Sequence, residues 1–110
     1  MSSLKLNGNL WIENGKGQVI GPGKKMLLEA IKNTGSIKSA AKAMKMSYRH
    51  AWEMTNTMNR IYSKPVIEKI AGGINGGGTR LTKEGELLIA TYNKLFEAFE
   101  EFKTQLNTTI

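Results

Sequence analysis

The chain has 110 residues, 40% of them hydrophobic, and a formal net charge of +7. This length predicts one compact core and no separate catalytic domain. The sequence has no cysteine and one histidine, which excludes a disulfide framework, a thiolate metal site and a histidine cluster for zinc, so we expect no metal and no cofactor.

The charge is unevenly distributed along the chain. Residues 1–82 contain 13 Lys and Arg against 4 Asp and Glu, a net of +9, whereas residues 83–110 contain 3 against 5, a net of −2. This favours a polyanionic partner for the first part, the alternative being a solvated basic face without a partner. The sequence lacks a secretory signal and any apolar run long enough to span a membrane, so we expect a cytoplasmic protein without membrane contact.

The N-terminal stretch predicts a short β-hairpin. Apolar and polar residues alternate over residues 4–12, Asn14-Gly15-Lys16-Gly17 is a turn signal, and Val19 and Ile20 resume the apolar pattern.

Two helices should follow the hairpin. Residues 24–34 predict the first, with Gly35 as its C-terminal cap. Ser36 is an N-cap for a second, short helix over residues 37–44, whose alanines allow close packing.

A third helix is predicted over residues 48–63, with Ser47 as its N-cap. Apolar spacing of three and four residues assigns its buried side to Ala51, Met54, Met58 and Ile61, with Trp52 extending that side. Its outer face should carry Arg49, His50, Glu53, Asn56, Thr57 and Arg60.

Two helices joined by a tight turn, the second with a polar outer face, are typical of a helix-turn-helix. Arginine can bind guanine, asparagine adenine, and glutamate cytosine in the DNA major groove. The first helix of the pair offers groups that suit phosphates, namely Ser36, Lys38, Ser39 and Lys42. Similar helix pairs also occur in domains that bind no nucleic acid.

A glycine-rich hairpin is predicted after this helix. Residues 66–71 and 79–82 favour strands, and residues 72–78 favour a flexible tip, which together indicate a wing. Its candidate contacts with the DNA backbone or minor groove are Lys69, Asn75, Thr79 and Arg80. A nucleotide phosphate loop is a weaker interpretation because no Gly-Lys-Ser/Thr follows the glycines, and a merely mobile hairpin tip is the other alternative.

The last helix is predicted over residues 83–106. An apolar repeat of four and three residues, typical of a two-stranded coiled coil, links Leu88, Tyr92, Leu95, Phe99, Phe102 and Leu106. Little of the chain remains to cover Phe99, Phe102 and Leu106, so we expect a second copy to cover this stripe, although ordinary core packing gives the same pattern.

Two stretches carry a family resemblance. SAAKAMKMSYRHAWEMTNTMN (39–59) and VIEKIAGGINGGGTRLTKEGELLIATY (66–92) resemble the N-terminal DNA-binding domain of the ModE-type, molybdate-responsive transcription regulators, which is similar to the winged domain of LysR regulators. The resemblance implies a winged helix-turn-helix, a dimer built by the terminal helix, and DNA contacts from the wing and from Ser47, Tyr48, Arg49 and His50. Full-length members carry C-terminal oxyanion-binding domains and this sequence stops at Ile110, so we expect no molybdate sensing from it.

These observations predict a mainly α fold with small β-hairpins, in which residues 1–82 form a winged helix-turn-helix and residues 83–110 a dimerisation helix of the same single domain. We expect a homodimeric, sequence-specific DNA-binding transcription regulator with double-stranded DNA as partner. The sequence does not indicate whether it has a small-molecule effector. Catalysis is not expected, because His50 has no nucleophile and acid at a recognisable spacing. The alternative is a winged-helix module that binds another protein and does not read DNA.

Overall fold

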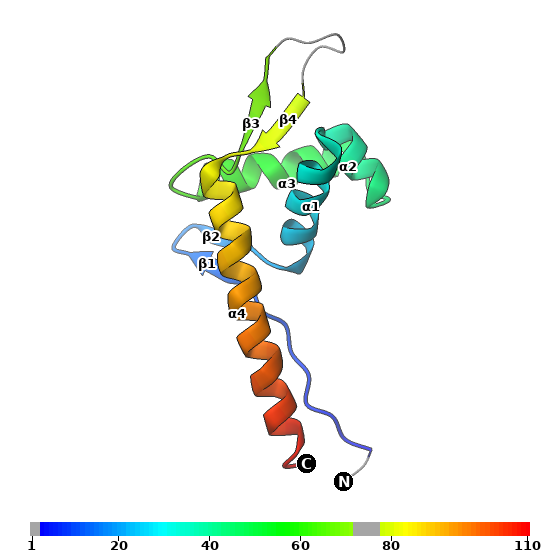
Figure 1. The fold of residues 1–110 in the computed structure, drawn as a ribbon, viewed down its shortest axis with the longest axis vertical. Helices are drawn as coiled ribbons and strands as arrows, with labels where there is room; N and C mark the ends of the chain where they lie inside the picture. Colours follow the sequence, from blue (N-terminus) through cyan, green and yellow to red (C-terminus); the bar gives the residue numbers. More distant parts are fainter. Residues whose placement is uncertain (1–2, 72–77) are drawn as a thin grey trace.

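The computed structural model describes residues 3–71 and 78–110, and these contain four helices and two antiparallel hairpins (Figure 1). In chain order the elements are β1 (Ile12–Asn14), β2 (Gly17–Ile20), α1 (Pro22–Thr34), α2 (Ile37–Ala43), α3 (Tyr48–Ile61), β3 (Ile67–Ile70), β4 (Gly78–Leu81) and α4 (Lys83–Asn107). The predicted fold class is confirmed. None of the described helices is long and apolar enough to cross a membrane.

The helix ends follow from the capping residues. Ser36 Oγ accepts a hydrogen bond from the Ser39 amide at 2.9 Å, and Ser47 Oγ accepts one from the His50 amide at 3.0 Å. Gly35 ends α1 at φ 82°, in the left-handed region, and its amide donates to the Ile31 carbonyl at 2.8 Å. These three caps are the ones that the sequence predicted.

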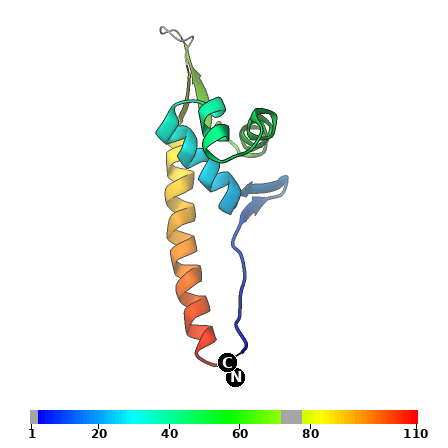
Figure 2. The same cartoon turned by 90° about the vertical axis from the view of Figure 1, so that its right-hand side faces the viewer.

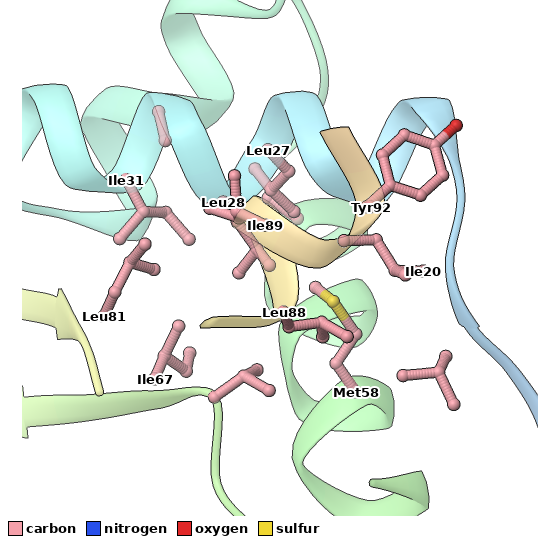
Figure 3. Close-up of a cluster of buried hydrophobic side chains, with 14 of the residues drawn as sticks. Ile20, Leu27, Leu28, Ile31, Met58, Ile67, Leu81, Leu88, Ile89 and Tyr92 are labelled. Carbon is pink, nitrogen blue, oxygen red and sulfur yellow. The ribbon is translucent and has the colours of Figure 1, made fainter. Parts of the chain in front are cut away.

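The hydrophobic core lies where α1 meets α3, α4 and the bases of the hairpins (Figure 3). Leu27, Leu28 and Ile31 on α1 are completely buried, and Met58 joins the same cluster from α3. The other labelled members come from the hairpins and α4, namely Ile20, Ile67, Leu81, Leu88, Ile89 and Tyr92. Because α1 supplies the central residues, it fixes α3 and α4 relative to each other.

Small residues hold α2 close to α3. Ala40 and Ala51 are 0% exposed and Ala41 is 2% exposed, and such small buried side chains allow α2 and α3 to pack closely. The turn that joins them includes Lys45 at φ 56°, a left-handed conformation that is uncommon for a residue other than glycine. The Met46 amide donates back to the Ala41 carbonyl at 3.0 Å, which stabilises this turn.

The β3–β4 hairpin, here called the wing, is anchored by two close backbone approaches. The Thr79 amide donates to the Gly35 carbonyl at 2.9 Å, and a Cβ on Gly78 would lie only 2.5 Å from that carbonyl oxygen. At the start of α4, a Cβ on Gly85 would collide with the Val66 carbonyl. These glycines allow the wing to pack against the α1–α2 turn and against α4.

Asn59 links the wing to α3. Its side-chain oxygen accepts from the Val66 amide at 2.8 Å, and its amide group donates to the Ile67 carbonyl at 3.3 Å. The wing therefore keeps a fixed position beside α3, projecting away from the body of the molecule (Figure 1).

The N-terminal stretch differs from the expected hairpin. The strands begin only at Ile12, and residues 3–10 instead run alongside the second half of α4 (Figure 2). The Leu6 amide donates to Asn107 Oδ1 at 2.7 Å, and Lys103 Nζ donates to the Gly8 carbonyl at 3.1 Å. Side chains of α4 thus replace a partner strand for this segment.

Candidate nucleic-acid interface

The exposed face of α3 carries four polar side chains in one row. Arg49, Glu53, Asn56 and Arg60 are all exposed, and their spacings of four, three and four residues place them along one side of the helix. Arg49 Nε lies 3.2 Å from Glu53 Oε1, and the Arg49 side chain is 89% exposed. An ion pair this exposed contributes little free energy, so Arg49 and Glu53 can separate and each can bind a nucleic-acid base instead.

The first turn of α3 adds further polar groups. Tyr48 and His50 are exposed, and Ser47 is occupied as the N-cap. The predicted outer residue Thr57 is only half exposed and lies at the margin of the row.

Trp52 does not extend the buried side of α3 as the sequence predicted. It is 45% exposed, whereas Thr55 is 1% exposed and takes the buried position, with its hydroxyl donating to the Trp52 carbonyl at 2.9 Å. The reason is geometric: Trp52 lies on the side of α3 that faces the wing, where α2 and the wing leave an open groove. The buried side is formed by Ala51, Thr55 and Met58.

The predicted phosphate-binding residues lie on α2 and just before it. Lys38, Ser39 and Lys42 are exposed, while Ser36 is half exposed and its hydroxyl accepts from the Ser39 amide. Lys38 and Lys42 are four residues apart and so share one side of α2. No salt bridge in the described part of the chain involves either lysine.

The wing residues differ in their availability. Lys69 is exposed, but Arg80 Nε lies 2.8 Å from Glu68 Oε1 across the β3–β4 ladder. Thr79 is 8% exposed and belongs to the wing base, so it does not project outward as expected. Asn75 lies outside the described residues.

The six residues predicted for dimerisation fall into two groups. Leu88 and Tyr92 are 5% and 2% exposed and pack in the core of their own chain, and Phe99 is half buried against Gly8 with Lys103 Nζ 5.3 Å from its ring centre. The exposed group, here called the distal stripe, consists of Leu95, Phe102 and Leu106.

The sequence repeat overlooked other exposed apolar side chains on α4. Leu87 is 59% exposed and Phe96 is 37% exposed. Leu87 lies eight residues before Leu95 on a neighbouring line of the helix, so plotting α4 as a helical wheel with its core side marked would have found it.

Among the residues that the structure describes, no three His, Asp or Glu side chains are grouped so that they could hold a metal ion.

Two curated relatives resemble this chain in sequence. It is 36% identical over 95 residues to the molybdenum transport protein ModE of Azotobacter vinelandii, covering 86% of this chain and 35% of that protein. It is 45% identical over 76 residues to the transcriptional regulator ModE of Haemophilus influenzae, covering 69% and 30%. The chain thus spans about a third of the length of these relatives. No protein-family model matches it.

Solved structures share the fold at lower identity. The full-length LysR-type regulator LysG of Corynebacterium glutamicum matches 82% of this chain and 29% of its own, with a TM-score of 0.57 and 19% identity. FabT of Streptococcus pneumoniae, solved in complex with DNA, matches 74% of this chain and 58% of its own, with a TM-score of 0.55 and 17% identity. The chain is therefore a homologue of the ModE-type transcription regulators, with the winged helix-turn-helix fold of DNA-binding regulators.

Proposed function

We propose that this chain is a sequence-specific DNA-binding module of a transcription regulator, which inserts α3 into the major groove of duplex DNA. The observation that carries the proposal is the row of Arg49, Glu53, Asn56 and Arg60 on a helix whose opposite side is fixed in the core. These side chains match the hydrogen-bonding edges of guanine, cytosine and adenine. The excess of positive charge in residues 1–82 supplies the attraction for phosphates.

The roles of α2 and α3 in this proposal differ. Arg49 and Asn56 read bases, whereas Lys38 and Lys42 on α2 hold the phosphate backbone and set the position of the module. The buried alanines between α2 and α3 make this division possible, because they keep the two sets of side chains at a constant separation.

The proposal is tested by separating base reading from backbone binding. A preferred duplex is first selected from a random library, and affinity is then measured for that duplex and for an unselected one. Arg49→Ala should cost about 1 to 3 kcal/mol on the preferred duplex only, whereas Lys42→Ala should weaken binding to both nearly equally. Lys94→Ala, an exposed lysine on α4, is the control and should change neither.

Salt dependence provides the second readout of the same experiment. A protein that neutralises about six to ten phosphates loses roughly 10³ to 10⁵ in affinity between about 50 and 200 mM salt. Affinity that does not change over this range would identify the chain as the alternative, a protein-binding module on the same scaffold.

We also propose that the module acts as a homodimer joined through the distal stripe. Leu95, Phe102 and Leu106 are 46%, 54% and 37% exposed, and they lie on one side of α4 next to the segment 3–10. Two copies related by a two-fold axis would bury these side chains and place two α3 helices about one DNA turn apart.

The dimer is tested with a charge in the stripe. Phe102→Asp should shift the protein from dimer to monomer in sedimentation at micromolar concentration, because an unpaired carboxylate in an apolar interface is costly. Thr104→Asp adds the same charge on the other side of α4 and should leave the dimer intact. A wild-type protein that sediments as a monomer would overturn the homodimer while leaving DNA binding by one module to be measured separately.

A further inference from the structure

A groove separates α3 from the wing, with Trp52 on its wall. It is lined by side chains of α2, α3 and the wing, including Ile37, Trp52, Asn56 and Lys69. Asn56, which belongs to the exposed row of α3, therefore also lines the groove.

Trp52 has an unusual environment for a tryptophan. The residue is 45% exposed. Within residues 3–71 and 78–110, the one side chain that hydrogen-bonds to Trp52 is that of Thr55, which donates to its backbone carbonyl, so the indole N–H has no acceptor there. The other tryptophan of the chain, Trp11, donates its N–H to Glu13 Oε2 at 3.1 Å. Among the residues that the structure describes, Trp52 therefore offers exposed aromatic surface and an unused hydrogen-bond donor at the groove.

The charges beside the groove are mainly positive. Lys38 on α2 and Lys69 on β3 both line it, and no salt bridge in the described part of the chain involves either of them. The acidic residue nearby, Glu68, is held by Arg80 at 2.8 Å across the wing. The groove thus combines an aromatic surface with two ammonium groups that form no ion pair within residues 3–71 and 78–110.

The geometry of duplex DNA indicates which part of it would lie in this groove, provided that the chain binds DNA as proposed above. If α3 occupies the major groove and the wing lies along the flanking minor groove, the sugar–phosphate strand that separates these grooves must pass between α3 and the wing. That position is the groove beside Trp52. Deoxyribose has apolar faces that an indole ring can cover, and its flanking phosphates accept hydrogen bonds and attract ammonium groups.

We propose that Trp52 is a positioning residue for DNA, which packs against one deoxyribose of the strand between α3 and the wing and donates its indole N–H to an adjacent phosphate. Lys38 and Lys69 bind the phosphates on either side of it. These contacts carry no base information, and they fix the angle at which the row Arg49, Glu53, Asn56 and Arg60 meets the base edges.

The test uses Trp52 as its own reporter. In the Trp11→Phe protein, Trp52 is the remaining tryptophan, and DNA binding is followed at low salt by the anisotropy of a labelled duplex while the tryptophan emission is recorded. Binding should change the intensity or wavelength of the Trp52 emission in step with the anisotropy. Trp11 lies outside the groove, so this background should bind DNA as the wild type does.

A conservative variant then separates the hydrogen bond from packing. In the same background, Trp52→Phe keeps an aromatic ring and removes the N–H donor, so affinity for selected and unselected duplexes should fall alike by about tenfold, the lower end for a hydrogen bond to a charged group. Its salt dependence should be unchanged, because no charge is lost. Lys69→Ala should instead reduce the salt slope by about one. Thermal unfolding of each variant confirms that the fold is retained.

Several outcomes distinguish this inference from the proposed function. If the Trp11→Phe protein binds DNA without any change in Trp52 emission, or if Trp52→Phe binds as tightly as its background, the role of Trp52 is overturned and DNA binding stands. A loss confined to the selected duplex would also overturn it, since Trp52 would then contact a base. If the background protein binds no duplex at low salt, the proposed function itself fails.

Discussion

The two halves of α4 have the same kind of apolar repeat and different surroundings. In residues 83–92, Gly85, Leu88, Ile89 and Tyr92 are buried against the rest of the fold. In residues 93–107 no side chain is fully buried, and the extended segment 3–10 lies along one side. The comparison teaches that a repeat of three and four residues marks the apolar side of a helix without telling whether its own chain or a second copy covers that side.

The difference predicts two levels of stability within one helix. Residues buried in a core open only with global unfolding, whereas segments with few buried contacts open locally at a much lower cost in free energy. The first half of α4 should therefore unfold together with α1 and α3, and the second half should open before them.

The largest change in the free energy of unfolding is expected when a buried side chain in the first half of α4 is shortened. Leu88→Ala should reduce the free energy of unfolding by about 2 to 5 kcal/mol, because it leaves a cavity among completely buried neighbours. Leu95→Ala is the matched control seven residues further along α4, and in the monomer it should cost less than about 0.5 kcal/mol because Leu95 is already 46% exposed. Chemical denaturation of both variants in the Phe102→Asp background, in which the chain should be monomeric under the homodimer proposal, measures the two values. Equal losses of unfolding free energy in the two variants would show that the two halves of α4 are equally stabilised by their surroundings.

A smaller change in the free energy of unfolding is expected for Tyr92, where the two halves of α4 meet. Tyr92 is 2% exposed, and its hydroxyl donates to the Leu10 carbonyl at 2.8 Å. Tyr92→Phe keeps the ring and removes this bond, so it should cost about 1 kcal/mol in the free energy of unfolding near neutral pH.

The same residue gives a pH dependence with a definite sign. Burial raises the pKa of Tyr92 above the usual tyrosine value of about 10. The folded pKa is higher than the unfolded one. The contribution of the buried, protonated Tyr92 hydroxyl to the free energy of unfolding is therefore complete below about pH 10, and it is lost as the pH rises toward the folded pKa. The difference in stability between wild type and Tyr92→Phe should thus narrow above pH 10 in urea denaturation, and a difference that widens there would contradict the assignment.

Much of the fold was predictable because local signals and core packing agree. Ser36 and Ser47 occur where a side-chain oxygen must satisfy the first amides of a helix, and Gly35 occurs where the chain must turn left-handed. The row of Arg49, Glu53, Asn56 and Arg60 follows from helix periodicity alone, since it lies opposite the buried Ala51, Thr55 and Met58.

The features that sequence reasoning missed depend on contacts between distant segments. The helical position next to Ala51 predicts that Trp52 extends the buried side of α3, but α2 and the wing leave that part of α3 open. Residues 4–10 alternate as a strand does, yet no strand pairs with them, and α4 side chains take that place. The packing of Gly85 against Val66 also has no local signature, because nothing in the sequence near either residue indicates the other.

The smallest change in the free energy of unfolding is expected at the C-terminal end of α4, where local and global opening can be measured separately. The Asn107 side chain binds both backbone groups of Leu6, accepting from its amide at 2.7 Å and donating to its carbonyl at 3.2 Å. These groups are exposed, so water replaces the lost bonds in Asn107→Ala, and the free energy of global unfolding should change by at most about 0.5 kcal/mol.

Local opening should nevertheless respond to this change. Asn107→Ala removes both hydrogen bonds that hold Leu6, whereas the bonds to Gly8 and Leu10 remain, so hydrogen exchange of the Leu6 amide should accelerate several-fold while exchange in α1 stays the same. Gln105→Ala removes an exposed amide side chain from the other side of α4 and should leave Leu6 unchanged. If Asn107→Ala accelerates exchange in α1 as well, the second half of α4 is coupled to the core, and the helix does not have two independent levels of stability.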